Sequence, residues 1–189
     1  ERGHLFIAQP PLYKVKHGKK EVYLKNEEEM DQFVVSQALA GLQLRIGGSL
    51  VSPDKFAEIV ERGVRYQSLL RTLSRDRSEV VLEAALEEAT KTALREAGGT
   101  VPMELSFATE FGEAVCESAS KAMAGSKVQH RIVESEDAGG WSIQIEMLVE
   151  GVWRHDALER ALLGSSAIRE MISILVDGEQ LMESHSSAT

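Results

Sequence analysis

A chain of 189 residues with 43% apolar and 27% charged side chains can bury a core and fits one domain or two small ones. It contains no run near the ~20 consecutive apolar residues that a membrane-spanning helix requires, so we expect no membrane partner. The single cysteine, Cys116, excludes an internal disulfide, and its Ala and Val neighbours favour a buried structural thiol over a nucleophile.

The net charge of −9 is distributed unevenly along the chain. Residues 1–25 hold six basic and two acidic side chains, whereas the remaining residues hold 15 basic and 28 acidic ones. A basic strip favours contact with phosphate groups, while an acidic surface repels a polyanion. The charge pattern therefore predicts two parts with different roles.

The first residues, ERGHLF, include no Met and lack the basic, apolar and small order of a signal peptide. We therefore expect a piece of a longer cytoplasmic protein. Residues 4–9 and 21–25 have the composition of strands, and Pro10 and Pro11 suit a strand end because they have no N–H to donate. The segment KHGKK predicts a hairpin turn between LYKV and EVYL.

At Asn26 the pattern becomes helical. Asn26 is a favourable N-cap, and the three glutamates that follow it occupy a first turn, where the helix dipole favours negative charge. Gly41 is expected to end this helix, and QLRI predicts a short strand before a pair of glycines. Ser52 and Pro53 then form a cap and first-turn pair.

Four further helices are predicted from apolar residues at helical spacing. They run from Pro53 through Leu73, over about 77–97, over about 107–124, and from Ser165 or Ser166 to Asp177–Gly178. A frayed tail, SHSSAT, is expected after the last one. The residues expected to face the core are Phe56, Ile59, Val60, Gly63, Gln67, Leu70 and Leu73, then Val81, Leu82, Ala85, Leu86, Ala89, Ala93 and Leu94, then Phe107, Phe111, Val115 and Met123.

Before the last helix the apolar period drops to two. In WSIQIEMLVE the odd positions from Trp141 to Val149 are apolar and the even ones polar, except Leu148, which is typical of a half-buried strand. VQHRIVESED, across the turn AGG, is expected to pair with it as a hairpin. The predicted fold class is therefore α+β, helix-rich with a small antiparallel sheet.

The sequence shows no self-contained active site. It has no zinc-protease spacing of histidines, no cysteine pair, no phosphate-binding glycine loop and no nucleophile elbow. His155 and Asp156 lie beside Trp153, but adjacent side chains rarely face each other, so a surface or turn role is expected. Trp141 and Trp153 are interpreted as core and hairpin residues. We predict no catalytic residue, metal or cofactor in this segment.

An acidic row is predicted on the helix over 77–97, formed by Glu79, Glu83, Glu87 and Glu88. Such a row either imitates a phosphate backbone and binds a basic partner, or is a solvated helix face. Lys91 and Arg95 follow at i+4 positions that partly relieve its charge, which favours the solvated face.

The segment FIAQPPLYKVKHGKKEVYLKNEEEMDQF, Phe6 to Phe33, resembles the end of the Toprim domain in the B subunits of bacterial DNA gyrase. AQPPLYKV is its most specific part. The paralogous subunit of topoisomerase IV carries a related but less similar segment and is the second choice. In gyrases without an insertion the acidic helix leads into a YKGLGEM-type motif, which this chain lacks.

The resemblance implies a division into two parts. Many Gram-negative gyrase B subunits carry an insertion of this size at this junction, and the elements up to LLGSSAIREMISILVDGE are loosely similar to it. Residues 1–36 are therefore expected to be the C-terminal edge of Toprim, a β-hairpin and a helix, and residues 37–189 the insertion domain.

The resemblance also implies what the whole enzyme does. It passes one DNA duplex through a double-strand break in another, uses ATP and Mg²⁺, and introduces negative supercoils. The groups for that chemistry lie outside this segment, which is expected to be inactive alone, with DNA, the gyrase A subunit and the rest of the gyrase B subunit as partners. The lysines expected to contact DNA phosphates are Lys14, Lys16, Lys19 and Lys20, and the alternative is that they are solvated hairpin lysines.

We thus expect a non-catalytic segment that braces the DNA gate, with an acidic insert that acts through protein contacts or by limiting where DNA lies. The rival hypothesis is a free-standing acidic interaction protein that imitates DNA. The acidic row supports that rival, but AQPPLYKV remains unexplained by it.

Overall fold

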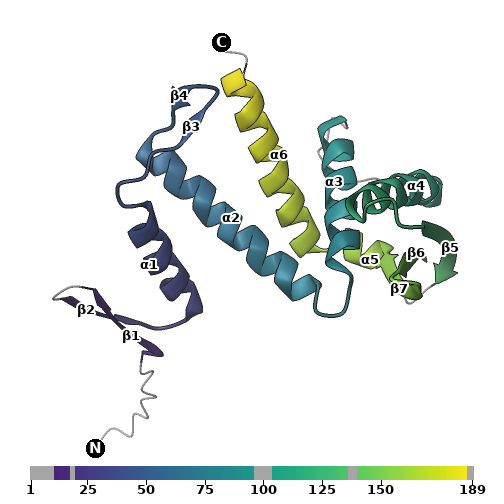
Figure 1. Ribbon diagram of the computed structural model, residues 1–189, viewed down its shortest axis with the longest axis horizontal. Coiled ribbons are helices and arrows are strands. Elements are labelled where there is room, and N and C mark those ends of the chain that lie inside the picture. The colour runs from purple at the N-terminus through teal and green to yellow at the C-terminus, as the bar shows by residue number, and fades with distance from the viewer. Residues whose placement is uncertain (1–10, 18–19, 96–103, 136–139, 187–189) are drawn as a thin grey trace, which may run out of the picture. The chain divides into compact units, whose positions relative to one another are not determined.

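The computed structural model describes residues 11–17, 20–95, 104–135 and 140–186 (Figure 1). Helices dominate, and the paired strands are antiparallel, so the predicted α+β class is confirmed. The chain divides into two compact units, 1–64 and 65–189. The predicted boundary after residue 36 falls inside a helix and stays a prediction, because compactness says nothing about where an insertion begins.

The N-terminal unit begins with a hairpin of β1 (Tyr13–His17) and β2 (Lys20–Leu24). The strands pair from Tyr13 opposite Leu24 to His17 opposite Lys20, as predicted. The strand expected over 4–9 and the two residues at the tip of the turn lie outside the described residues.

Helix α1 (Glu27–Leu39) begins where its capping signal predicts. The Asn26 side chain accepts the backbone N–H of Glu29 at 2.8 Å, which satisfies one of the free donors at the helix start. Gly41 follows the helix end with a φ of +87°, a left-handed conformation that glycine adopts without a steric penalty.

A second small hairpin, β3 (Arg45–Ile46) with β4 (Ser49–Leu50), precedes α2 (Pro53–Leu73). The predicted cap of α2 is confirmed, since the Ser52 hydroxyl accepts the N–H of Lys55 at 3.3 Å. Gly63 and Gln67 were placed on the packed face of this helix by their spacing, and that placement is wrong because both are exposed.

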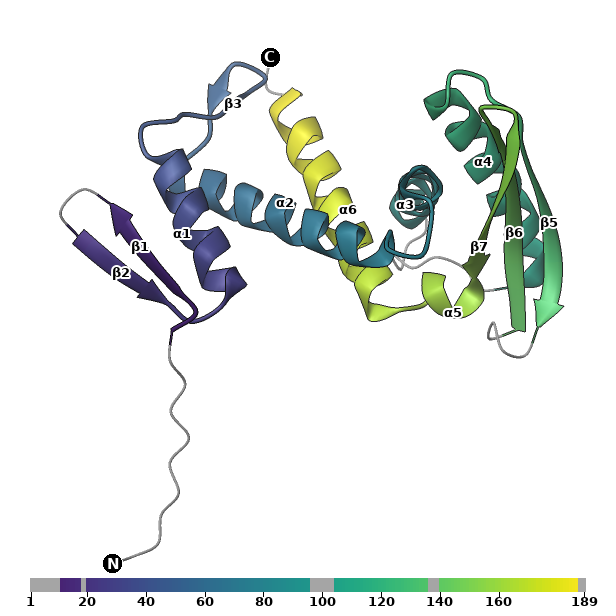
Figure 2. The ribbon, with the colours of Figure 1, turned by 60° about the horizontal axis from the view of Figure 1, so that its bottom comes forward.

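The C-terminal unit contains the end of α2, further helices and one sheet. These elements are α3 (Glu79–Arg95), α4 (Leu105–Ala122), β5 (Val128–Ser135), β6 (Gly140–Val149), β7 (Val152–Glu159), α5 (Arg160–Leu163) and α6 (Ser166–Ser186). The sheet order is β5-β6-β7. Helix α4 lies against β5 and β6, and α3 contacts both α4 and α6 (Figure 2).

Helix α3 is buried on nearly all sides because α4 and α6 both pack on it. Its apolar residues are core members, among them Val81, Leu82 and Leu86, each at most 1% exposed. Leu94 is an exception to the predicted inward face, with 44% exposure. The exposed side of the helix is the narrow row formed by Glu79, Glu83, Glu87 and Lys91.

Strand β6 confirms the period of two. Trp141, Ile143, Ile145 and Met147 are at most 3% exposed and belong to the core. Residues Ser135 and Gly140 end the β5–β6 pairing, so the predicted hairpin across AGG is also confirmed.

Two expectations near the C-terminus are wrong. Residues 152–159 form strand β7, and a turn at His155–Asp156 does not occur. Helix α6 does not stop at Gly178 but continues to Ser186, which takes in half of the tail expected to fray. Glycine inside a helix costs only about 1 kcal/mol relative to alanine, and helix-favouring residues resume after it.

Candidate nucleic-acid interface

The β1–β2 hairpin has one covered and one exposed face, because side chains alternate along each strand. Tyr13, Val15 and Val22 are half-buried and Leu24 is 7% exposed on the covered side. Lys14 and Lys16 project from the opposite face, where both are exposed. The hairpin therefore presents two of the four predicted lysines together.

Lys14 is held in place by two neighbours on β2. Its Nζ lies 2.8 Å from Glu21 Oε2 and 5.6 Å from the centre of the Tyr23 ring. Both partners are exposed, so the ion pair is screened by water and is worth ~0–1 kcal/mol. A phosphate could replace Glu21 as the partner of Lys14 at little cost.

Lys16 stands opposite Glu21 in the strand register, but no ion pair joins it to any residue in the described part of the chain. Lys20 belongs to β2, and its side chain lies outside the described set, as does all of Lys19. The structure thus places Lys14 and Lys16 on one face and leaves the positions of the other two lysines a prediction.

The predicted acidic row on α3 is a solvated face that is partly neutralised. Lys91 Nζ contacts Glu87 Oε1 at 2.6 Å and Glu88 Oε1 at 2.8 Å, and these contacts raise the pKa of Lys91. Glu88 also accepts the Ser118 hydroxyl at 2.8 Å, which ties α3 to α4. The side chain of Arg95 lies outside the described residues.

Cys116 is the buried structural thiol that the sequence predicts. It is 8% exposed, and burial raises its pKa to about 11, which keeps the thiol protonated at neutral pH. Its Sγ lies 3.7 Å from His130 Nδ1. A protonated thiol beside a half-buried imidazole is not an activated nucleophile.

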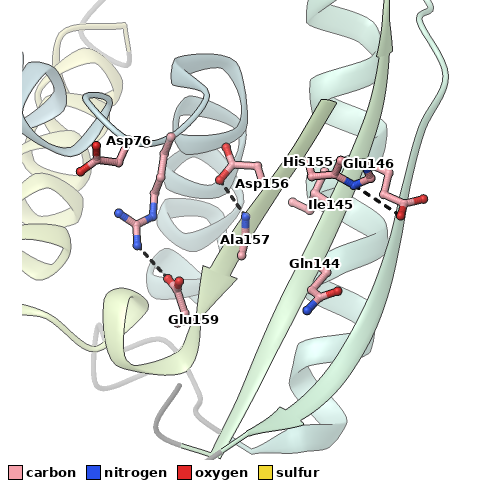
Figure 3. Close-up of a pocket in the computed structure, with 9 residues that line it drawn as sticks. Asp76, Gln144, Ile145, Glu146, His155, Asp156, Ala157 and Glu159 are labelled. Carbon is pink, nitrogen blue, oxygen red and sulfur yellow. Dashed lines mark hydrogen bonds and ion pairs between the residues drawn. The ribbon is translucent and has the colours of Figure 1, made fainter. Parts of the chain in front are cut away.

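A second polar region, absent from the sequence prediction, surrounds strand β7. It is a hollow of about 590 Å³ between β6, β7 and the α2–α3 loop (Figure 3). The charged side chains that line it are Asp76, Arg77, Glu146, His155, Asp156 and Glu159. Within it Arg77 contacts Glu159 at 3.0 Å, and His155 Nδ1 lies 3.5 Å from Glu146 Oε1.

Asp156 and His155 occupy opposite sides of β7, as Figure 3 shows, so they do not act on each other. The Asp156 carboxylate accepts the Ser78 N–H at 2.6 Å and the Ala157 N–H at 2.7 Å. Burial raises the pKa of Asp156, and the two N–H donors and Arg77 only partly oppose that effect. The carboxylate thereby anchors the sheet to the start of α3.

The sequence missed this hollow because its lining comes from three separate segments. The segment VWRHDALE has apolar and charged residues on both of its faces, so its hydrophobicity does not alternate. No cluster of three or more His, Cys, Asp or Glu side chains suited to a metal occurs among the residues that the structure describes. In that same part of the chain, none of the helices is both long and apolar enough to cross a bilayer.

Comparison with known proteins connects the hairpin to a family. Residues 11–39, which hold β1, β2 and α1, match the family described as GyrB, hook. The DNA gyrase B subunit of Rickettsia bellii is 34% identical over 83 residues, which cover 43% of this chain and 10% of that protein. The gyrase B subunit of Caulobacter vibrioides strain NA1000 is 35% identical over 88 residues, or 46% of this chain and 11% of that protein.

The class that these matches define is the B subunit of type 2 topoisomerases, since a protein of that name from Aquifex aeolicus is 49% identical over 37 residues, or 20% of this chain and 5% of that protein. The matches that extend over more of the chain carry a more particular name, the DNA gyrase B subunit, so the predicted resemblance is confirmed. The chain spans about a tenth of the length of those gyrase relatives. The matched family is called hook, and the assignment of residues 1–36 to Toprim stays a prediction.

Proposed function

We propose that this chain is a non-catalytic segment of a DNA gyrase B subunit and supports ATP-dependent negative supercoiling in the cytoplasm. The observation that carries the proposal is the match of residues 11–39 to the GyrB hook family, together with the lysine face of the same hairpin. ATP and Mg²⁺ would be bound by parts of the enzyme outside this chain. DNA, the gyrase A subunit and the rest of the gyrase B subunit would be its partners.

In this proposal the lysine face positions the DNA without reading its sequence. Lys14 and Lys16 are two residues apart on a strand, which separates them by about 6–7 Å. Duplex DNA offers one phosphate per ~3.4 Å of axis on each strand, so both lysines can reach the same backbone. Lys19 and Lys20 follow at the turn and would extend the contact.

The C-terminal unit would act through protein contacts or by limiting where DNA lies. Residues 65–189 hold 12 basic and 21 acidic side chains, which accounts for the whole net charge of −9. Residues 1–64 hold nine of each sign. A surface with that excess of carboxylates repels a duplex, so direct clamping of DNA is left to the hairpin.

The test is a double change, Lys14→Ala with Lys16→Ala, in the complete gyrase. If both lysines contact phosphates, DNA affinity falls and the slope of log affinity against log salt decreases by about one for each lost contact. The matched control is Lys55→Ala, which removes an exposed lysine from α2 in the same unit. An unchanged affinity and salt slope would return Lys14 and Lys16 to the role of solvated hairpin lysines.

A further inference from the structure

Strand β7 is an edge of the three-stranded sheet, and its first half is open on both faces. The sheet order β5-β6-β7 leaves one side of β7 without a neighbouring strand in the described part of the chain. Val152 is 61% exposed and Trp153 41% exposed, and Arg154 and His155 are exposed as well. Helix α4 covers β5 and β6, so this part of β7 extends past the helical layer.

The hydrogen bonds show which backbone groups face the open side. The Ala157 N–H donates to the Asp156 carboxylate and so points away from β6. Because N–H and C=O groups alternate direction along an antiparallel strand, those of Trp153 and His155 point the same way. No backbone partner for them occurs among the residues that the structure describes. Four hydrogen-bonding groups are therefore available to an added strand.

The open edge ends where the α2–α3 loop meets it. The Ser78 N–H donates to Asp156, which places the loop directly beside β7 at that residue. A strand added along 152–155 would therefore stop there, and its next residue would enter the hollow shown in Figure 3.

The charge of the hollow selects what that next residue is. Four carboxylates line it, against the guanidinium of Arg77 and the imidazole of His155. Arg77 already contacts Glu159, and no ion pair joins Asp76 to another residue within the described ranges. An incoming guanidinium fits this setting best, since it can donate to two carboxylate oxygens at once.

We propose that the edge of β7 binds an extended peptide segment of a partner protein by strand addition along residues 152–155, with an arginine of that segment in the hollow beside Asp76 and Glu146. Backbone hydrogen bonds supply the affinity in this mode of recognition, and the side-chain hollow supplies the specificity. The proposal rests on and deepens the protein-contact role assigned above to residues 65–189. Its test uses no DNA, so its failure is distinguishable from failure of the lysine hypothesis.

The test uses the isotope-labelled 189-residue chain and an acetylated, amidated peptide of sequence TVTVTR. Saturable shifts are expected at the amides of Trp153 and His155 and in the Asp76 loop. The same peptide with Glu in place of Arg is expected to bind at least about tenfold more weakly, because it brings a carboxylate to a hollow of carboxylates.

Two variants of one residue separate backbone recognition from side-chain recognition. His155→Pro removes an outward N–H that β6 does not use, and Pro is tolerated on such an edge. It is expected to weaken binding about 3–10-fold, the value of one lost hydrogen bond, whereas His155→Ala keeps the N–H and stays within about twofold. Asp76→Asn is expected to weaken the Arg peptide and not a Gln peptide.

Three results would overturn the proposal. The first is equal binding of the Arg and Glu peptides, and the second is binding that His155→Pro leaves intact. The third is a dimer of the chain that His155→Pro dissociates, because the occupant of the edge would then be a second copy.

Discussion

Gly112 lies on α4 where that helix meets the ring of His130 on β5. A Cβ built at Gly112 would stand 2.7 Å from His130 Cδ2, closer than real Cβ contacts come. The ring is not free to turn without loss, since its Nδ1 lies 3.7 Å from the Sγ of the buried Cys116. The close approach of α4 to the sheet thus depends on the absence of one side chain.

We predict that Gly112→Ala lowers the free energy of unfolding by about 1–3 kcal/mol relative to Gly63→Ala, the cost of overpacking. Both positions are helical and gain the same propensity from alanine, but no atom lies within 4 Å of a Cβ at Gly63. Chemical denaturation of the two variants measures the difference. Equal stabilities would show that His130 moves aside without cost.

Single residues carried the local signals that the sequence revealed. Asn26 and Ser52 cap their helices as predicted because a cap depends on groups within three residues. The contact of Gly112 with His130 carries no such signal, because it joins a helix to a strand across a turn.

At the scale of elements, Asp156 connects β7 to α3. Its folded pKa is raised, so the folded state binds the proton more tightly than the unfolded state does. The stability from this group is therefore fully present below its ordinary pKa of 3.8 and is lost as pH rises through the folded value. The ionised carboxylate is the form that burial penalises.

Asp156→Asn is predicted to be less stable than the unaltered chain at a pH below 3.8, since the amide NH₂ cannot accept one of the two N–H groups. The deficit is expected to shrink as pH rises, because Asn carries no charge to bury. Denaturant titrations across this pH range measure the trend.

The control is Glu170→Gln, which acts on a carboxylate with the opposite shift. Hydrogen bonds from Arg65, at 2.7 and 2.8 Å, lower the pKa of Glu170. Its stabilising effect is present above its ordinary pKa and is lost as pH falls, so its deficit is expected to grow with pH. Parallel trends in the two variants would contradict the burial explanation for Asp156.

Strand β7 is the element that the sequence did not reveal. A strand is recognised by alternation only when one face is uniformly apolar, as in β6. Along β7, Arg154 and Asp156 share a face with Leu158, while Trp153 shares the other with His155. Its pairing with β6 is what makes it a strand.

At the scale of the whole molecule, buried apolar residues are concentrated in one unit. The core cluster runs from Leu70 to Ile172 and lies entirely within 65–189. In the described part of residues 1–64, the buried apolar side chains are Leu24 and Val51. Several large apolar residues of that unit are exposed, among them Leu12 at 70% and Leu42 at 60%.

Hydrogen exchange in the complete chain is predicted to reflect this imbalance. Amides of α3, α4 and β6 should exchange at least about 100-fold more slowly than those of β1, β2 and α1, because opening a packed core costs more than opening a small unit. Mass spectrometry of the exchanged peptides measures this. Uniform protection along the chain would show that residues 1–64 are stabilised in a way that their burial does not reveal.

The sequence by itself determined the fold class, the capped helices, the β5–β6 hairpin and the resemblance to gyrase B subunits. Each depends on side chains close together in the chain, where caps, turns and alternating strands leave local patterns. It also indicated the charge difference between the basic start of the chain and the acidic remainder.

Only the tertiary structure decided that β7 is a strand with an open edge, that Lys14 and Lys16 share one exposed face, and that Asp156 reaches α3. The Ser78–Asp156 hydrogen bond joins residues 78 positions apart. Such contacts depend on how distant segments pack, and packing is set by the whole core rather than by any local pattern.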